Sequence, residues 1–211
     1  MATLLFGAAA SPCVRAARLA LEEKGVAYEF VAIDPVTLKG SENLARHPFG
    51  RMPSFEHDGF KLYETQAIMR YADQAFPGPA LQPAEPRRAA RMNQIMGIVD
   101  WYVFPMVSAA ITFERLVAPR LLGRPSDEAR IAAAIPHAKH CLAAIEALID
   151  QGPYLTGASL SLADLHALPH LEYLTHTAEG RSVLEAHERL RGWVAHLTDR
   201  AAVARAMPRA A

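Results

Sequence analysis

The chain has 211 residues, of which 51% are hydrophobic and 21% are charged, a balance typical of a globular protein with a substantial core. Lys plus Arg equals Asp plus Glu at 22 each, so the net charge is zero and nothing predicts a basic surface for nucleic acid. The two cysteines, Cys13 and Cys141, lie far apart, which excludes a disulfide framework and fits a reducing compartment.

The N-terminal residues 1–10 are apolar, but they lack the basic start of a secretory signal and are needed as a first strand. No stretch is expected to reach the roughly 20 uncharged apolar residues that span a bilayer. We therefore expect a soluble cytoplasmic protein without a membrane partner.

The first elements predict a strand, a helix and a second strand. An apolar strand over 2–6 leads to a helix that starts at Ser11-Pro12 and ends at Lys24-Gly25. Residues 26–33 are rich in Val, Ile, Tyr and Phe, which favour a strand. Such a crossover implies that the two strands are parallel.

A hairpin follows this unit. A helical turn is expected over 41–46, and Pro53 introduces a strand over 54–57. Asp58-Gly59 is a two-residue turn sequence, so residues 60–63 should return antiparallel.

The domain then closes with a helix, which Thr65 can cap and which Phe76-Pro77-Gly78-Pro79 stops. The order βαβαββα is that of a thioredoxin-like domain. We place this α/β domain at residues 1–76, a proline-rich linker at 77–86, and an all-α domain at 87–211.

The second domain is Ala-rich and helical in period. Pro105 should kink or break its first long helix near Phe104, and another helix is expected over 126–150. Ser161 and Asp164 have the spacing of a variant capping box, and we assign both to structure rather than to chemistry.

Ser11 is the strongest candidate for chemistry. It stands at the start of the first helix, where unpaired N–H groups and the helix dipole stabilise an anion such as a thiolate. Its hydroxyl can add one directed hydrogen bond. The alternative is that Ser11 is only an N-cap, with Pro12 at the first helical position.

Three blocks of sequence resemble the soluble glutathione transferases, in particular the serine-type phi class. The first covers residues 6–11 and 21–29, and the other two are HPFGRMP at 47–53 and LYETQAIMRY at 62–71. Their order and spacing together carry the resemblance, which spans both domains.

The resemblance implies that glutathione is the co-substrate and that the hydroxyl of Ser11 holds its thiolate. Met52 would pair with the tripeptide as an added strand, because the resemblance implies a cis peptide bond to Pro53. Glu64 would bind the γ-glutamyl amine, and Thr65 at a helix start would bind the neighbouring carboxylate.

Two basic residues match the end of the family's site that holds the glycine carboxylate. Lys39 matches a phi-class basic position, and Arg51, which stands where Gln or Lys is usual, can share the carboxylate. Leu38 replaces a frequent histidine and Ala16 a family arginine, so the chain departs from the pattern at both positions.

The resemblance further implies an electrophilic hydrophobic second substrate held by the helical domain. The candidate wall residues, which can equally be core or subunit contacts, are Met96, Trp101, Tyr102, Phe104 and Met106. Phe49 lies in a loop that wedges into a partner subunit in related classes, which favours a homodimer.

Other functions stay open at this point. A zeta-like cis-trans isomerase shares the Ser-x-Cys spacing of Ser11 and Cys13, thiol-disulfide exchange would use Cys13 as nucleophile, and a non-catalytic binding module would keep only the fold. His166 and His170 have metal-ligand spacing on a helix, but they lack a third ligand, so no metal is predicted.

Overall fold

The computed structural model describes residues 2–207, which form two compact units. The first unit combines residues 2–82 with 199–207, and the second is Pro83–Thr198. The domain limits derived from the sequence stay a prediction. What the packing adds is that the last helix belongs with the N-terminal unit.

The first unit is built on a four-stranded sheet in the order β2-β1-β3-β4. Strand β1 is parallel to β2, and β3 is antiparallel to β4, as predicted. Strand β1 also pairs antiparallel with β3. Strand β2 is shorter than the expected 26–33, because the backbone N–H of Val26 closes the preceding helix on Leu21 (2.9 Å). The strands are β1 (Thr3–Gly7), β2 (Glu29–Ala32), β3 (Ser54–His57) and β4 (Phe60–Tyr63).

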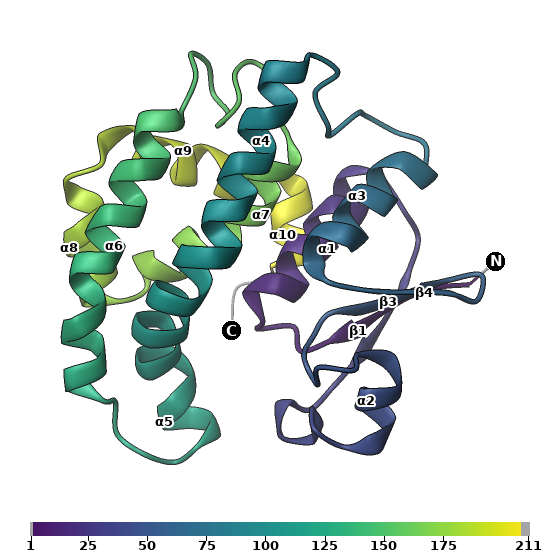
Figure 1. Cartoon of the computed structure of the whole chain (residues 1–211), viewed down its shortest axis with the longest axis horizontal. Helices are drawn as coiled ribbons and strands as arrows, with labels where there is room; N and C mark the ends of the chain where they lie inside the picture. The colour runs from purple at the N-terminus through teal and green to yellow at the C-terminus, as the bar shows by residue number, and fades with distance from the viewer. Residues whose placement is uncertain (1, 208–211) are drawn as a thin grey trace. The chain divides into compact units, whose positions relative to one another are not determined.

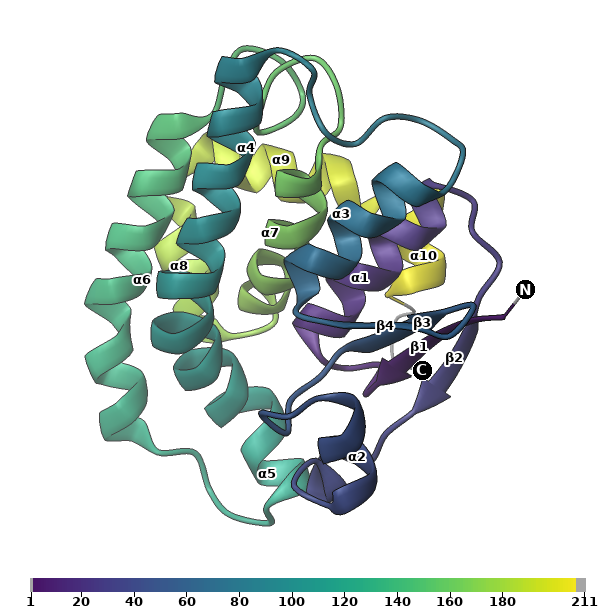
Figure 2. The ribbon, with the colours of Figure 1, turned by 45° about the vertical axis from the view of Figure 1, so that its right-hand side comes forward.

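Helices cover both faces of this sheet. Figure 2 shows α1 and α3 together on one face and α2 on the other side. The helices of the first unit are α1 (Pro12–Glu23), η1 (Pro35–Thr37), α2 (Ser41–Arg46), α3 (Thr65–Ala75) and α10 (Ala201–Ala206). Apolar side chains from the sheet, α1 and α3 form one core: Leu5, Val14, Ala17, Leu21, Phe55, Ile68 and Ala72.

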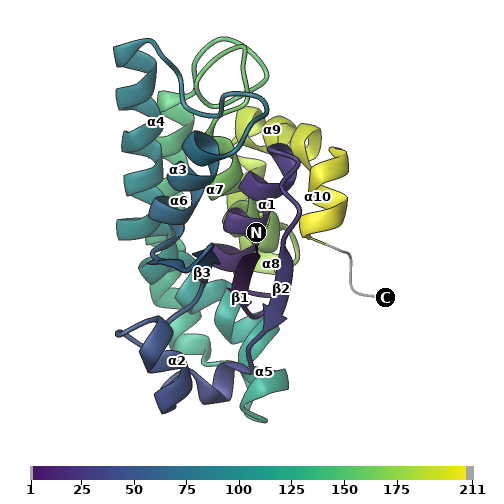
Figure 3. The same cartoon turned by 90° about the vertical axis from the view of Figure 1, so that its right-hand side faces the viewer.

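Helix α10 packs on α1 (Figure 3). Hydrogen-bonded ion pairs between arginines near α10 and glutamates of α1 stabilise this contact. The guanidinium of Arg200 donates to both carboxylate oxygens of Glu23 at 2.8 Å, and Arg205 donates to Glu22 at 2.6 Å. Arg18 of α1 donates in turn to the carbonyl of Arg205 (2.9 Å). Helix α10 therefore belongs to the same structural unit as α1.

The second unit is helical, with α4 and α6 side by side (Figure 1). Helix α7 is its centre, because the run from Leu162 to Leu171 is buried on every side. Its helices are α4 (Pro86–Ile98), η2 (Val99–Val117), α5 (Ala118–Leu121), α6 (Glu128–Leu148), α7 (Leu162–Thr175), α8 (Ala178–Glu185) and α9 (Glu188–Thr198).

Pro105 does not break the first long helix. The chain stays helical from Pro86 to Leu121, and the segment η2 that contains Pro105 is wound as a π-helix. Proline has no N–H and its ring clashes with the preceding turn of an α-helix, so a locally wider winding accommodates it.

This long helix also corrects the expectation that no segment is apolar enough to span a membrane. Pro86–Leu121 contains such an 18-residue window by length and composition. Half of the window is buried inside the protein, as in the core helix of a helical domain.

The carboxylate of Asp164 lies at the centre of the helical unit and is completely buried. It accepts hydrogen bonds from the backbone N–H and from the hydroxyl of Ser161. The bond from the backbone N–H is the one that the carboxylate contributes to the predicted capping box. It also accepts from the backbone N–H of Leu155 and from the indole of Trp193, both at 2.8 Å. Burial raises the pKa of Asp164, and these hydrogen bonds oppose that shift.

We predict that Asp164→Ala lowers the free energy of unfolding by about 3 kcal/mol, since it leaves the buried donors of Leu155 and Trp193 without an acceptor. Urea unfolding followed by Trp fluorescence checks this. Glu188→Ala, at an exposed position at the start of α9 in the same unit, is the control and should change stability by less than about 0.5 kcal/mol. An unchanged midpoint for Asp164→Ala would exclude the structural role.

Two fully buried histidines lie one turn apart on α7. His166 Nε2 pairs with Asp100 at 2.7 Å, and His170 Nδ1 pairs with Ser108 at 2.9 Å. The second nitrogen of each ring has no partner within residues 2–207. Burial lowers the pKa of His170 to about 3, with a smaller contribution from His166, while Asp100 opposes the shift.

A pKa of about 3 in the folded state and about 6.5 in the unfolded state gives a defined pH dependence. Between these values the unfolded chain binds one more proton, so the free energy of unfolding falls by about 1.4 kcal/mol per unit as pH drops through the window. Denaturant unfolding at pH 7, 6 and 5 measures this slope. In His170→Gln the slope should be smaller, and an identical slope would refute the assignment.

Candidate active site

The strand register brings the predicted site segments to one end of the sheet. Phe6 at the end of β1 pairs with Ser54, which starts β3, and Ser54 pairs with Tyr63, which ends β4. Gly7 likewise pairs with Ala32 at the end of β2. The chain therefore leaves or enters the sheet at the same end in all four strands, next to Ser11, Lys39, Arg51, Met52, Pro53, Glu64 and Thr65.

Ser11 is the N-cap of α1, with Pro12 in the first helical turn. Its Oγ accepts from the N–H of Val14 at 3.4 Å, a long bond, and an accepting oxygen leaves the hydroxyl proton available to a ligand. Both readings of Ser11, as cap and as donor, are therefore compatible. Gly7 allows the end of β1 to lie close to α1, because a Cβ atom at this position would lie 2.4 Å from a methyl group of Val14.

The peptide bond from Met52 to Pro53 is cis, as the resemblance implied. The Sδ atom of Met52 accepts from the backbone N–H of Ala8 at 3.1 Å, which joins this loop to the segment before Ser11. Within residues 2–207, no hydrogen bond uses the backbone N–H or C=O of Met52. These two groups are free to pair with an extended peptide.

Lys39 and Arg51 lie in neighbouring exposed loops that a buried amide joins. The side-chain amide of Asn43 donates to the carbonyls of Leu38 and Arg51 at 3.0 and 3.2 Å, and Lys39 Nζ donates to the carbonyl of Phe49 at 2.8 Å. Asn43 was missed by the sequence reasoning. Its burial marks it as a structural residue, and this burial is visible only in the folded structure.

Glu64 has an unusual backbone conformation, with φ of 73° and ψ of 119°. This is a left-handed region that side chains avoid, and such strain is concentrated at functional sites. Glu64 occupies the N-cap position of α3 without making a side-chain cap, so its exposed carboxylate is not used by its own helix. Thr65, expected as the cap, is instead the first helical residue and is largely buried.

His47 is a second residue that sequence reasoning did not single out. Its ring is 2% exposed and packs on Tyr63 (centroids 4.9 Å apart) and Phe49 (6.2 Å). Nδ1 has no partner within residues 2–207. Burial lowers the pKa of His47 and the charge of Glu64 opposes this, so the ring is a neutral support beneath the loop.

The residues proposed for the second substrate differ in exposure. Met96 is fully buried, which makes it a core residue of the helical unit. Trp101, Tyr102 and Met106 are exposed, at 76%, 52% and 40%, and remain available to a ligand or a partner. Phe49 is exposed as well, at 62%.

Within residues 2–207, no group of three or more His, Cys, Asp or Glu side chains has the arrangement of a metal site. Neither Cys13 nor Cys141 forms a disulfide bond, and burial raises the pKa of Cys141. The candidate site thus contains a hydroxyl at a helix start, free backbone groups, one carboxylate and two exposed cations.

Two family models match the chain, the N-terminal domain of glutathione S-transferase over residues 5–80 and the C-terminal domain over 128–196. A glutathione S-transferase of Hyoscyamus muticus is 30% identical over 98% of both chains. The chain belongs to the glutathione S-transferase family.

Other members of the family agree with this assignment. Glutathione S-transferase F7 of Arabidopsis thaliana is 29% identical and covers 93% of this chain and 94% of its own. The crystal structure of glutathione transferase F7 from Populus trichocarpa superposes with a TM-score of 0.86 at 30% identity, over 97% of both chains. A glutathione S-transferase I structure bound with lactoylglutathione is 29% identical, with a TM-score of 0.85 over 98% of each chain. The fold, an α/β thioredoxin-like unit followed by helices, is confirmed.

The strain at Glu64 predicts an unusual order of stabilities. Both Glu64→Gly and Glu64→Ala remove the carboxylate, but only glycine adopts the positive φ freely, so Glu64→Gly should be the more stable variant by about 1 kcal/mol. Urea unfolding at neutral pH measures the difference.

The same pair of substitutions at Gln66, inside the first turn of α3, is the control. There the helical backbone favours alanine by about 1 kcal/mol, so the sign is reversed. If the alanine variant were the more stable one at Glu64 as well as at Gln66, Glu64 would carry no backbone strain.

Proposed function

We propose that the chain is a phi-like glutathione transferase in which Ser11 stabilises the glutathione thiolate for attack on an electrophilic hydrophobic substrate. The observation that carries the proposal is the hydroxyl of Ser11 at the start of α1, beside the free backbone groups of Met52. The N-terminal end of α1 adds favourable potential for an anion at the same place.

The tripeptide would lie along the end of the sheet. Its cysteinyl backbone pairs with the N–H and C=O of Met52, next to Pro53, as an added strand. Its γ-glutamyl amine binds Glu64, and its α-carboxylate binds Thr65 and the first N–H groups of α3, which lack intrahelical partners. Lys39 and Arg51, which lie in two loops that the amide of Asn43 joins, provide cations for the glycine carboxylate.

Ionising the thiol requires a modest energy. A free thiol has a pKa near 8.5, and each unit of lowering corresponds to about 1.4 kcal/mol. A shift of roughly two units therefore needs about 2.7 kcal/mol, which one charge-assisted hydrogen bond and a helix terminus can provide. Ser11 acts as a hydrogen-bond donor and not as a nucleophile.

The helical unit would carry the electrophile, with Trp101, Tyr102, Phe104 and Met106 as the remaining wall candidates. Exposed Phe49 supports a homodimer, because a bare aromatic side chain gains by inserting into a second copy. We expect the enzyme in the cytoplasm.

Three alternatives to a transferase can be distinguished from it by experiment. A zeta-like isomerase would turn over a maleyl-type diacid and not a chloronitrobenzene, so assaying both separates it from a transferase. Thiol-disulfide exchange or peroxidase chemistry at Cys13 would give a mixed disulfide with glutathione. A non-catalytic module would fail to bind a glutathione affinity column.

Ser11→Ala should lower kcat/KM at neutral pH by about tenfold or more, because the lost hydrogen bond contributes at least about 1.4 kcal/mol to the ionised thiol. The apparent thiol pKa, read from thiolate absorbance or from the pH profile of the rate, should rise. The fold should persist.

Cys13→Ala is the matched control, two residues along the same helix. It should leave the thiol pKa and the rate unchanged, whereas a redox role would make it inactive. If Ser11→Ala kept both the rate and the pKa, the proposed mechanism would fail.

A further inference from the structure

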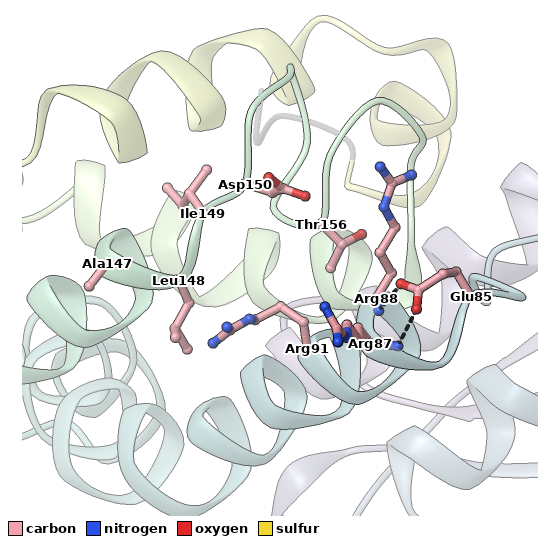
Figure 4. A pocket seen from close by; sticks show the side chains of 9 residues that line it. All are labelled: Glu85, Arg87, Arg88, Arg91, Ala147, Leu148, Ile149, Asp150 and Thr156. Atoms are coloured by element: carbon pink, nitrogen blue, oxygen red, sulfur yellow. Dashed lines mark hydrogen bonds between the residues drawn. The ribbon is translucent and has the colours of Figure 1, made fainter.

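The turn that joins β3 to β4 lies at the opposite end of the sheet from the candidate active site. Strand β3 starts at Ser54, beside that site, and ends at His57. At the turn, the backbone N–H of Asp58 donates to the carbonyl of Ala2 (3.1 Å), and its carboxylate accepts from the N–H of Ala2 (3.0 Å). The hollow that Figure 4 shows is a different place again, at the start of α4 and the end of α6 in the helical unit.

A phenol and an imidazole meet at this turn, among aromatic rings. The hydroxyl of Tyr71, on α3, lies 2.8 Å from Nδ1 of His57. The ring of Tyr71 contacts Phe60 (centroids 5.3 Å apart), and the ring of His57 contacts Phe76 (4.7 Å). Phe60 is exposed, Tyr71 is half-buried, and 19% of the His57 side chain is exposed. The phenol and the imidazole therefore both reach the surface.

The charge of Asp58 determines which ring nitrogen of His57 carries the proton. Its Oδ2 lies 3.7 Å from Nε2 of the ring. A carboxylate beside one ring nitrogen favours the tautomer with the proton on that nitrogen. Nδ1 then has a lone pair and accepts the hydrogen bond that the hydroxyl of Tyr71 donates. The phenol thus has a base in position to take its proton.

The other exposed phenol of the hairpin has no such base. Tyr63, at the end of β4, is 38% exposed and also packs on a histidine ring, that of His47 (centroids 4.9 Å apart). Within residues 2–207, however, no hydrogen bond uses the hydroxyl of Tyr63. Exposure alone would make Tyr63 the more reactive phenol, whereas a general base favours Tyr71.

We propose that Tyr71 is a covalent modification site for acylating aryl esters, with His57 as the general base. A nucleophile within hydrogen-bond reach of a base that a third group orients is the arrangement that activates a hydroxyl for covalent chemistry. The exposed ring of Phe60 beside Tyr71 provides an apolar surface for the aryl group. The proposal does not depend on the transferase activity.

The reaction transfers one acyl group to the chain. The phenol oxygen of Tyr71 bonds to the carbonyl carbon of the ester while Nδ1 of His57 takes the hydroxyl proton. The bond from that carbon to the aryloxy oxygen then breaks. The aryloxide leaves with the electron pair and takes up the proton from His57. The products are an O-acyl tyrosine and a phenol, so atoms and charge balance without a further reactant.

The test is incubation of the full chain with p-nitrophenyl acetate in the absence of glutathione, with the rate at each residue followed by peptide mass spectrometry. Tyr71 should be acetylated at least about tenfold faster than Tyr63, because general-base assistance typically contributes about 100-fold or more. His57→Gln keeps a hydrogen-bond acceptor but cannot take the proton, so it should slow Tyr71 at least about tenfold. Tyr71→Phe should remove this label and leave the rate at Tyr63 unchanged.

His140→Gln, at an exposed histidine of α6, is the matched control and should leave the acetylation rate of Tyr71 unchanged. The comparison of Tyr71 with Tyr63 uses the unaltered chain, so it holds even if a variant is destabilised. Acetylation of Tyr63 as fast as that of Tyr71, an unchanged rate at Tyr71 in His57→Gln, or no acetylation of Tyr71 would each overturn the proposal.

Discussion

The pairing of β1 with its two neighbours is the constraint on which the candidate site depends. Because β3 runs against β1, the loop that begins β3 lies beside the loop that ends β1. Because β4 runs against β3, its end returns to the same place. A slip of one residue in either register would turn the core side chains outward, so burial of Leu5 and Phe55 also fixes the positions of Ser11, Met52 and Glu64.

Much of this arrangement could be predicted from the sequence, because the signals were local. Asp58-Gly59 determines a hairpin, Gly25 ends a helix, and Ser161 with Asp164 starts one. The position of β3 beside β1, and not beside β2, has no such local signal. The family resemblance added the roles of residues whose local context is unremarkable, such as Lys39 and Glu64.

The remainder depended on long-range contacts that no local pattern contains. Asn43 and His47 are buried by loops that meet only in the folded state, so both look like ordinary polar residues of a short helix. The positive φ of Glu64 is imposed by the turn from β4 into α3. Pro105 was expected to kink or break the helix, and the break does not occur because a wider winding accommodates the proline. Met96 could be a wall residue or a core residue by its position in the sequence, and its burial decides for the core.

The attachment of α10 to α1 has a consequence for how the chain acquires its structure during synthesis. Translation proceeds from the N-terminus, and domains generally fold as units while the chain emerges. Here the first unit lacks α10 until residues 199–207 have been made, so the partners of Glu22 and Glu23 arrive after the whole helical unit. Until then the surface of α1 that contacts α10 is uncovered, so synthesis of the first 82 residues alone does not complete the sheet unit.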